Sequence, residues 1–164
     1  MKPKNQLRLL EPIQKLTCLH IEDKVSLMFD VFGGIDILGA ACGDQIKIFA
    51  CQLVANANTT GRDLGDYAVK VLAHEFRHVQ QLNFKDLPQV ADNNRRIGMG
   101  LKPTGYSDES YYNDPGEVDA RDFADYMAKA MKAPYKKKLA RLFRWINRQQ
   151  YHDWYPFILN RYGE

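Results

Sequence analysis

The sequence predicts an α+β fold, in which a small antiparallel or mixed sheet from the first third of the chain packs on two helices and a basic helix follows near the C-terminus. Two observations support this class. Ile46, Ile48 and Ala50 alternate with other residues in a segment rich in β-branched side chains, which is typical of a strand. Apolar residues then recur at helical spacing in residues 63–83 and again after Pro115.

Size and composition limit the class of protein. The chain has 164 residues, enough for one domain and short for two, so we expect a single domain over residues 1–164. A net charge of +3 is too small to indicate nucleic acid or acidic lipid as a partner. No stretch resembles a secretory signal or a membrane span, and the three cysteines form no Cys-x-x-Cys pair. We therefore expect a cytoplasmic protein without membrane contact.

The first third contains the predicted sheet. Residues 25–32 are apolar and fit either a strand or a helix, and glycines in 33–34 and 39–43 predict turns. Residues 45–51 are predicted to form a strand, and the polar residues 56–61 a loop.

The first long helix is predicted over about residues 63–83, with Asp63 as its N-cap. Its apolar stripe consists of Leu64, Ala68, Val71, Leu72, Val79 and Leu82. The polar segment 85–114 follows. Because an unstructured loop of about 30 residues is uncommon within a domain, we expect this segment to hold a short helix or to form a lid over a site.

The C-terminal third contains two more predicted helices. One begins at Pro115, with Asp114 as N-cap, and ends near Lys132. The next covers about residues 135–149, and the aromatic tail, residues 151–162, is predicted to pack back on the domain.

The segment His74-Glu75-Phe76-Arg77-His78 is a His-Glu-x-x-His motif within the first long helix. Residues four apart lie one helical turn apart on nearly the same side, so both imidazoles can reach one zinc ion at about 2.0–2.1 Å. Glu75 can take a proton from a metal-activated water molecule and return it to a leaving amine. Because Glu75 and His78 fall within the apolar stripe, they need partners, which a metal supplies. The alternative is a hydrogen-bonded His/Glu pair without a metal.

A zinc site of this kind needs a third protein ligand and an open position. Glu117 is the favoured ligand, because alanines one and two turns later would let its helix approach the histidines closely. Asp119 and Asp122 are alternative ligands, and Asp119 also suits an acceptor that orients a ligating imidazole. Glu117 could instead form a capping box with Asp114. Two histidines and a carboxylate also suit iron(II), manganese or cobalt.

Two segments together, His74-Glu75-x-x-His78 and Pro115-x-Glu117-x-Asp119-Ala120, resemble the minimal gluzincins, in particular the ImmA/IrrE-type peptidases of phages and bacteria. The resemblance covers about residues 45–131.

This resemblance implies a zincin-like fold, with His74, His78 and Glu117 as metal ligands and Glu75 as general base and acid. It implies Zn²⁺ as cofactor and a peptide or protein as substrate. It also implies that the strand at residues 45–51 binds an extended peptide along its edge. The expected function is that of a zinc metallopeptidase.

Such an enzyme needs a group that stabilises the oxyanion of the transition state. We expect Tyr111 in this role, with Tyr112, Tyr106 and His152 as alternatives. Packing near the start of the second helix is the other interpretation of these tyrosines.

Residues 132–148, from Lys132 to Arg148, contain seven basic residues and no acidic one, opposite an apolar face. A solvated helix face is the favoured interpretation. The alternative function is a catalytically silent zinc-containing module that contacts nucleic acid or an acidic partner through this helix. A toxin or effector whose proteolysis is aimed at one host protein is a third possibility. The sequence does not indicate an oligomeric state.

Overall fold

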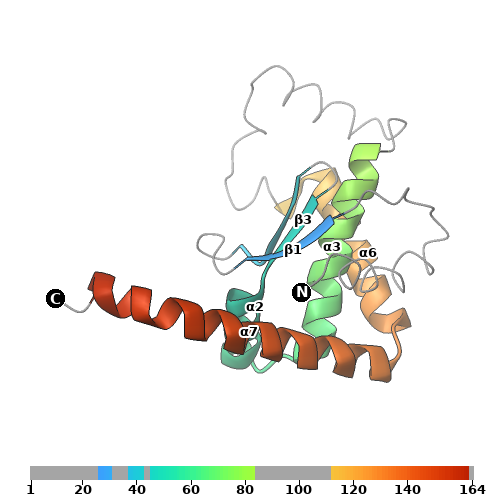
Figure 1. Cartoon of the computed structure of the whole chain (residues 1–164). Helices are drawn as coiled ribbons and strands as arrows, with labels where there is room; N and C mark the ends of the chain where they lie inside the picture. Colours follow the sequence, from blue (N-terminus) through green and yellow to red (C-terminus); the bar gives the residue numbers. More distant parts are fainter. Residues whose placement is uncertain (1–25, 31–36, 43–44, 84–111, 163–164) are drawn as a thin grey trace, which may run out of the picture.

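The computed structural model describes residues 26–30, 37–42, 45–83 and 112–162 (Figure 1). The strands are β1 (Ser26–Asp30), β2 (Gly39–Cys42) and β3 (Gln45–Phe49). The helices within these ranges are α2 (Ala50–Thr60), α3 (Leu64–Asn83), α6 (Pro115–Ala130) and α7 (Ala133–Tyr162). A small sheet combined with helices confirms the predicted α+β class. None of the described helices is both long and apolar enough to cross a bilayer.

The sheet is mixed, with β3 in the centre. Its strand order is β1-β3-β2, and β3 pairs parallel with β1 and antiparallel with β2. Ile48 lies opposite Phe29 on one side and Gly39 on the other. Ile46 and Ile48 are fully buried, as their alternation predicted. Because both edges of β3 are paired, the edge strand inferred from the resemblance for residues 45–51 is wrong; among the described strands, β1 and β2 form the edges of the sheet.

Two short segments differ from their predicted structure. Residues 39–42 form β2 rather than a turn, since their pairing with β3 compensates for side chains too small to show a pattern. Residues 56–60, predicted as a loop, belong to α2, which already begins at Ala50. The hydroxyls of Thr59 and Thr60 donate to carbonyls one turn earlier, and the helix ends at Gly61, whose φ is 66°.

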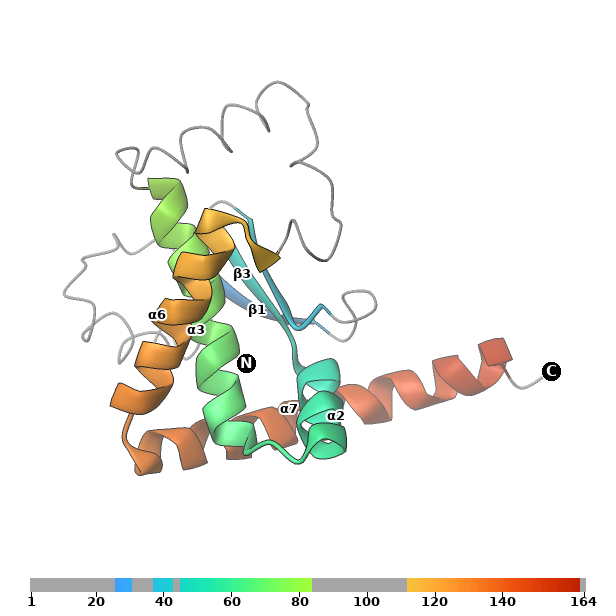
Figure 2. The ribbon, with the colours of Figure 1, turned by 180° about the vertical axis from the view of Figure 1, so that it is seen from behind.

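Helix α3 packs against α6 and α7 and also against strands β2 and β3 (Figure 2). Its first turn is capped as predicted, with the amide of Asp66 donating to Asp63 Oδ1 at 2.9 Å. Five members of its apolar stripe are buried, namely Leu64, Ala68, Val71, Leu72 and Val79. The ring of Phe29 in β1 contacts the ring of Phe143 in α7 edge-on, with 5.5 Å between the ring centroids. The core therefore surrounds α3.

Helix α6 begins as predicted. Asp114 is the N-cap, and its Oδ1 accepts from the amides of Gly116 and Glu117 at 2.9 and 3.2 Å. Ala120 and Ala124 are buried where α6 packs against α3. These small side chains allow the close approach that the sequence predicted.

Helix α7 is longer than predicted, covering Ala133–Tyr162 in place of 135–149. The tail at 151–162, predicted to pack back on the domain, instead continues the helix past α2 and away from the sheet (Figures 1 and 2). Its aromatic residues and Pro156 lower helix propensity, which is why the sequence predicted an earlier end. The segment predicted as a lid lies almost wholly outside the described residues.

Candidate metal centre

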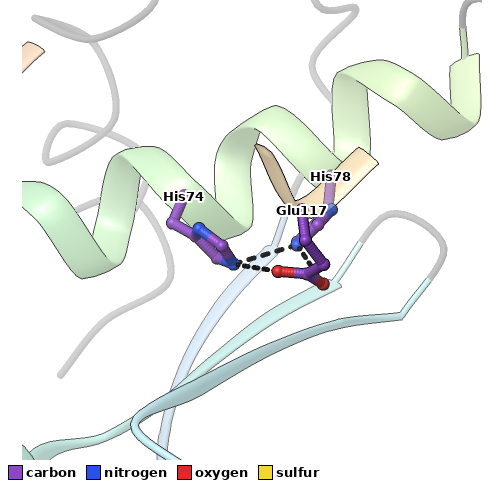
Figure 3. A group of neighbouring side chains, drawn as sticks. All are labelled: His74, His78 and Glu117. Carbon is purple, nitrogen blue, oxygen red and sulfur yellow. Dashed lines mark hydrogen bonds and ion pairs between the residues drawn. The ribbon is translucent and has the colours of Figure 1, made fainter. Parts of the chain in front are cut away.

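Three predicted ligands meet at one point between α3 and α6 (Figure 3). His74 Nε2 and His78 Nε2 lie 3.0 Å apart. The carboxylate of Glu117 faces both rings, with Oε2 3.1 Å from His74 Nε2 and Oε1 3.2 Å from His78 Nε2. The three side chains are therefore close enough to hold one metal ion, and all three are only partly exposed.

The spacing of these atoms fits a tetrahedral ion. Two ligands at zinc distances of about 2.0–2.1 Å lie about 3.3 Å apart when the geometry is tetrahedral. The three observed separations are slightly shorter than that. Glu117 Oε2 is buried and has no well-aligned hydrogen bond within the described residues, despite its distance to His74. A buried carboxylate oxygen in this situation is suited to a cation.

The two helices supply the ligands in different ways. On α3 the four-residue spacing stacks the two imidazoles one turn apart, with their rings edge-to-face at 4.6 Å between centroids. On α6 the ligand lies in the first turn, where the helix dipole stabilises a negative charge. Asp114 caps this turn, while the carboxylate of Glu117 turns toward the histidines. The N-cap and the ligand are thus compatible roles of neighbouring residues.

The carboxylate of Glu117 and the imidazole of His78 shift each other's pKa values. Burial would raise the pKa of Glu117, but its contacts with His74 and His78 outweigh burial and lower the pKa well below the usual value for glutamate. Burial would lower the pKa of His78, but its interaction with Glu117 dominates and raises it. The group therefore favours an ionised carboxylate, which is the form that binds a metal.

Glu75 lies on the same helix and faces the sheet. Its side chain is only 7% exposed. A β-carbon placed on Gly39 of β2 would lie 2.8 Å from Glu75 Cγ and 2.9 Å from Oε1, so the strand passes directly over this carboxylate. Burial raises the pKa of Glu75, and the nearby charges of His74 and His78 partly offset that rise.

The remaining predicted residues have other positions. Asp119 does not contact an imidazole directly; it accepts from Gln81, whose own oxygen contacts His78. Asp122 is exposed and does not belong to the metal-binding group. Tyr111 lies outside the described residues. Tyr112 is exposed.

Sequence reasoning missed Gln81 and Gly39 as parts of the site. Gln81 lies near the C-terminal end of α3 and is buried, so its polarity at an inward-facing position was a usable signal. Gly39 had no such signal, because its role depends on the pairing of β2 with β3.

Comparisons with models of protein families, with curated proteins and with solved structures found no match to this chain. The metal centre is therefore inferred from the side chains of His74, His78 and Glu117 alone.

Proposed function

We propose that this protein is a zinc-dependent metallopeptidase of zincin-like fold, which hydrolyses peptide bonds with Glu75 as general base and acid. The observation that supports it most is the convergence of two imidazole nitrogens and one carboxylate at 3.0–3.2 Å, next to a buried glutamate. The resemblance of both helices to minimal gluzincins agrees with this arrangement.

Zinc is the favoured metal because two histidines and one carboxylate, with a fourth position open, form a common catalytic zinc site. When bound, zinc polarises a substrate carbonyl and makes water more acidic. Iron(II), manganese and cobalt accept the same ligands and are the alternatives that metal analysis distinguishes.

The position of Glu75 supports its proposed role in proton transfer. It directly follows the ligand His74 on α3, and its side chain lies at the surface of α3 that faces β2. A carboxylate there can accept a proton from attacking water and donate it to the leaving nitrogen. The low exposure of Glu75 limits proton exchange with bulk solvent.

The substrate is proposed to bind as an extended peptide along β2. Both edges of β3 are paired, whereas no described strand pairs with the outer edge of β2. Since Gly39 of β2 contacts Glu75, a peptide added to this edge would pass close to the metal-binding group.

The proposal is tested by elemental analysis and peptide cleavage on protein purified without chelators. About one zinc ion per chain is expected in wild type, lost in His78→Ala and in Glu117→Ala. Glu75→Gln is expected to keep zinc but to lose about 100-fold or more in cleavage, since it cannot accept a proton. Asp122→Asn is the matched control, because it changes an exposed acidic residue on α6, the helix of Glu117. It should keep both zinc and cleavage. Zinc-free wild type, or zinc binding indifferent to Glu117, would contradict the proposal.

A second candidate function is a zinc-containing binding module. Lys137, Lys138, Arg141, Arg144 and Arg148 are all exposed on α7. This surface could contact nucleic acid or an acidic partner. Salt-sensitive binding to nucleic acid that survives Glu75→Gln, together with no cleavage by wild type, would favour this function.

A further inference from the structure

Gln81 links the two helices that supply the metal ligands. Its side chain is 6% exposed and makes three polar contacts. Its Oε1 lies 2.9 Å from His78 Nδ1, on the same helix. Its Nε2 donates across the interface to the carbonyl oxygen of Gly116 at 2.9 Å and to Asp119 Oδ2 at 2.7 Å.

These contacts determine how the amide is oriented. A glutamine amide has two N–H donors, and here both have oxygen acceptors on α6. Exchanging the amide nitrogen and oxygen would set Oε1 against two other oxygens, which is unfavourable. The oxygen of Gln81 therefore faces His78 and accepts the Nδ1 proton.

The orientation also favours one tautomer of His78, the one with its proton on Nδ1, in competition with Glu117 Oε1, which lies 3.2 Å from Nε2. When Nδ1 carries the proton, Nε2 has a free lone pair. That nitrogen is the one that faces His74 and Glu117. The ring is thus held in the form that binds a metal, with its binding atom directed at the other ligands.

Asp119 is itself fixed by Arg77. The guanidinium donates from Nε to Asp119 Oδ2 at 2.7 Å and from Nη2 to Oδ1 at 3.0 Å. This pairing is the main reason why the pKa of Asp119 is lowered, and it keeps the carboxylate of Asp119 a hydrogen-bond acceptor. Arg77 also lies over the ring of Phe123, which helps to hold the guanidinium in place. The acceptor of Gln81 is therefore rigidly placed.

We propose that Gln81 is a positioning residue of the metal centre, which holds His78 in its metal-binding tautomer and fixes the peptide bond before Glu117 relative to α3. Through these bonds one buried side chain sets the separation of two ligands that lie on different helices. The role in metal binding rests on the proposed zinc site, whereas the tautomer of His78 is a property of the protein without metal.

The first test compares two glutamines that are neighbours on α3. Gln81→Met replaces the amide by an apolar group of similar length, and Gln80→Met does the same one residue earlier. Gln80 is also buried, at 1% exposed, but its oxygen contacts Arg77 rather than a ligand. Zinc affinity, measured by competition with a chromogenic chelator, is expected to fall about 10–100-fold in Gln81→Met. It should stay within about 3-fold of wild type in Gln80→Met, which lacks a direct bond to the ligand.

The second test measures the tautomer of His78 without metal. Long-range ¹H–¹⁵N correlation spectra, recorded above the pKa of the ring, distinguish a protonated Nδ1 from a protonated Nε2. Wild type and Gln80→Met should show the Nδ1–H form, and Gln81→Met a mixture of both. Thermal melts of the metal-free variants verify that all are folded.

The outcomes separate this inference from the proposed function. Wild type that holds the Nδ1–H form but binds no zinc would contradict the zinc site and leave the positioning of His78 supported. Unchanged zinc affinity and an unchanged tautomer in folded Gln81→Met would overturn the positioning role alone. An equal loss of affinity in Gln80→Met would also overturn it, because the effect would then come from packing.

Discussion

Glu75 and Gly39 lie so close together that the identity of one residue limits the position of the other. A β-carbon on Gly39 would lie 2.8–3.0 Å from three atoms of the Glu75 side chain. Carbon and oxygen atoms that are not bonded do not stay this close, so one side must shift when a β-carbon is added. The flexible side is the Glu75 side chain, the proposed catalytic carboxylate. The strand backbone is paired with β3, so the carboxylate is the part that would move.

We therefore predict that Gly39→Ala disables cleavage while leaving the metal site intact. A carboxylate misplaced by about 1 Å is expected to lower the rate of peptide cleavage about 100-fold. Zinc content should stay at the wild-type level, because the three atoms nearest to the added β-carbon all belong to Glu75 and not to a ligand. Asp122→Asn, which changes an exposed side chain of α6 outside the metal-binding group, is the control and should keep both cleavage and zinc. Full cleavage by Gly39→Ala, or loss of its zinc, would contradict the prediction.

At the scale of elements, α3 is held at its start by α7 and farther along by α6. Gly65 lies in the first turn, and a β-carbon there would be 2.5 Å from the carbonyl oxygen of Lys136. That neighbour is backbone rather than a flexible side chain. The metal-binding group begins nine residues later, about 13 Å farther along the axis at 1.5 Å per residue. Packing of α7 and binding of metal thus involve separate parts of the helix.

Gly65→Ala is accordingly predicted to destabilise the fold and to spare the site. Separating α3 from α7 by such overpacking is expected to cost about 1–3 kcal/mol. Urea unfolding monitored by circular dichroism measures this change, and zinc content should not fall under native conditions. Lys70→Ala, which removes an exposed ion pair with Asp125, should cost less than about 1 kcal/mol. An unchanged urea midpoint in Gly65→Ala would contradict the close contact between Gly65 and the backbone of Lys136.

The elements also differ in how far the sequence predicted them. The predictions of α3 and α6 were correct because the sequence signals for them are local. These signals are the N-caps Asp63 and Asp114 and apolar residues at helical spacing. The four-residue strand β2 consists of small residues, and it exists because β3 pairs with it. Helix α2 was not predicted at all: residues 50–51 were predicted to end the preceding strand, and the polar residues 56–60 to form a loop.

The same distinction applies to the site. The three defining residues of the motif, His74, Glu75 and His78, and the third ligand were predicted from spacing along helices, which the backbone geometry enforces. The relay from Asp119 through Gln81 to His78 crosses between helices. Its partners depend on the rotation of α6 against α3, which a single sequence does not specify.

For the whole molecule, the metal-binding group joins two helices that are far apart in sequence. His74 and Glu117 are separated by 28 residues outside the described ranges, 84–111, besides parts of both helices. Any ion bound by both helices binds the folded chain and not the unfolded one. Its binding free energy is therefore added to the free energy of unfolding.

This linkage predicts that removal of metal lowers the melting temperature of the wild-type protein. Free zinc at 100 times its dissociation constant stabilises a fold by about 2.7 kcal/mol, which for a chain of this size corresponds to on the order of 5–10 °C. Differential scanning calorimetry with EDTA, and again after zinc is restored, should show this shift and its reversal. In Glu117→Gln, which keeps the volume of the side chain but loses its charge, the same treatment should move the melting temperature little. If EDTA left the melting temperature of zinc-containing wild type unchanged, the ion would not bridge α3 and α6.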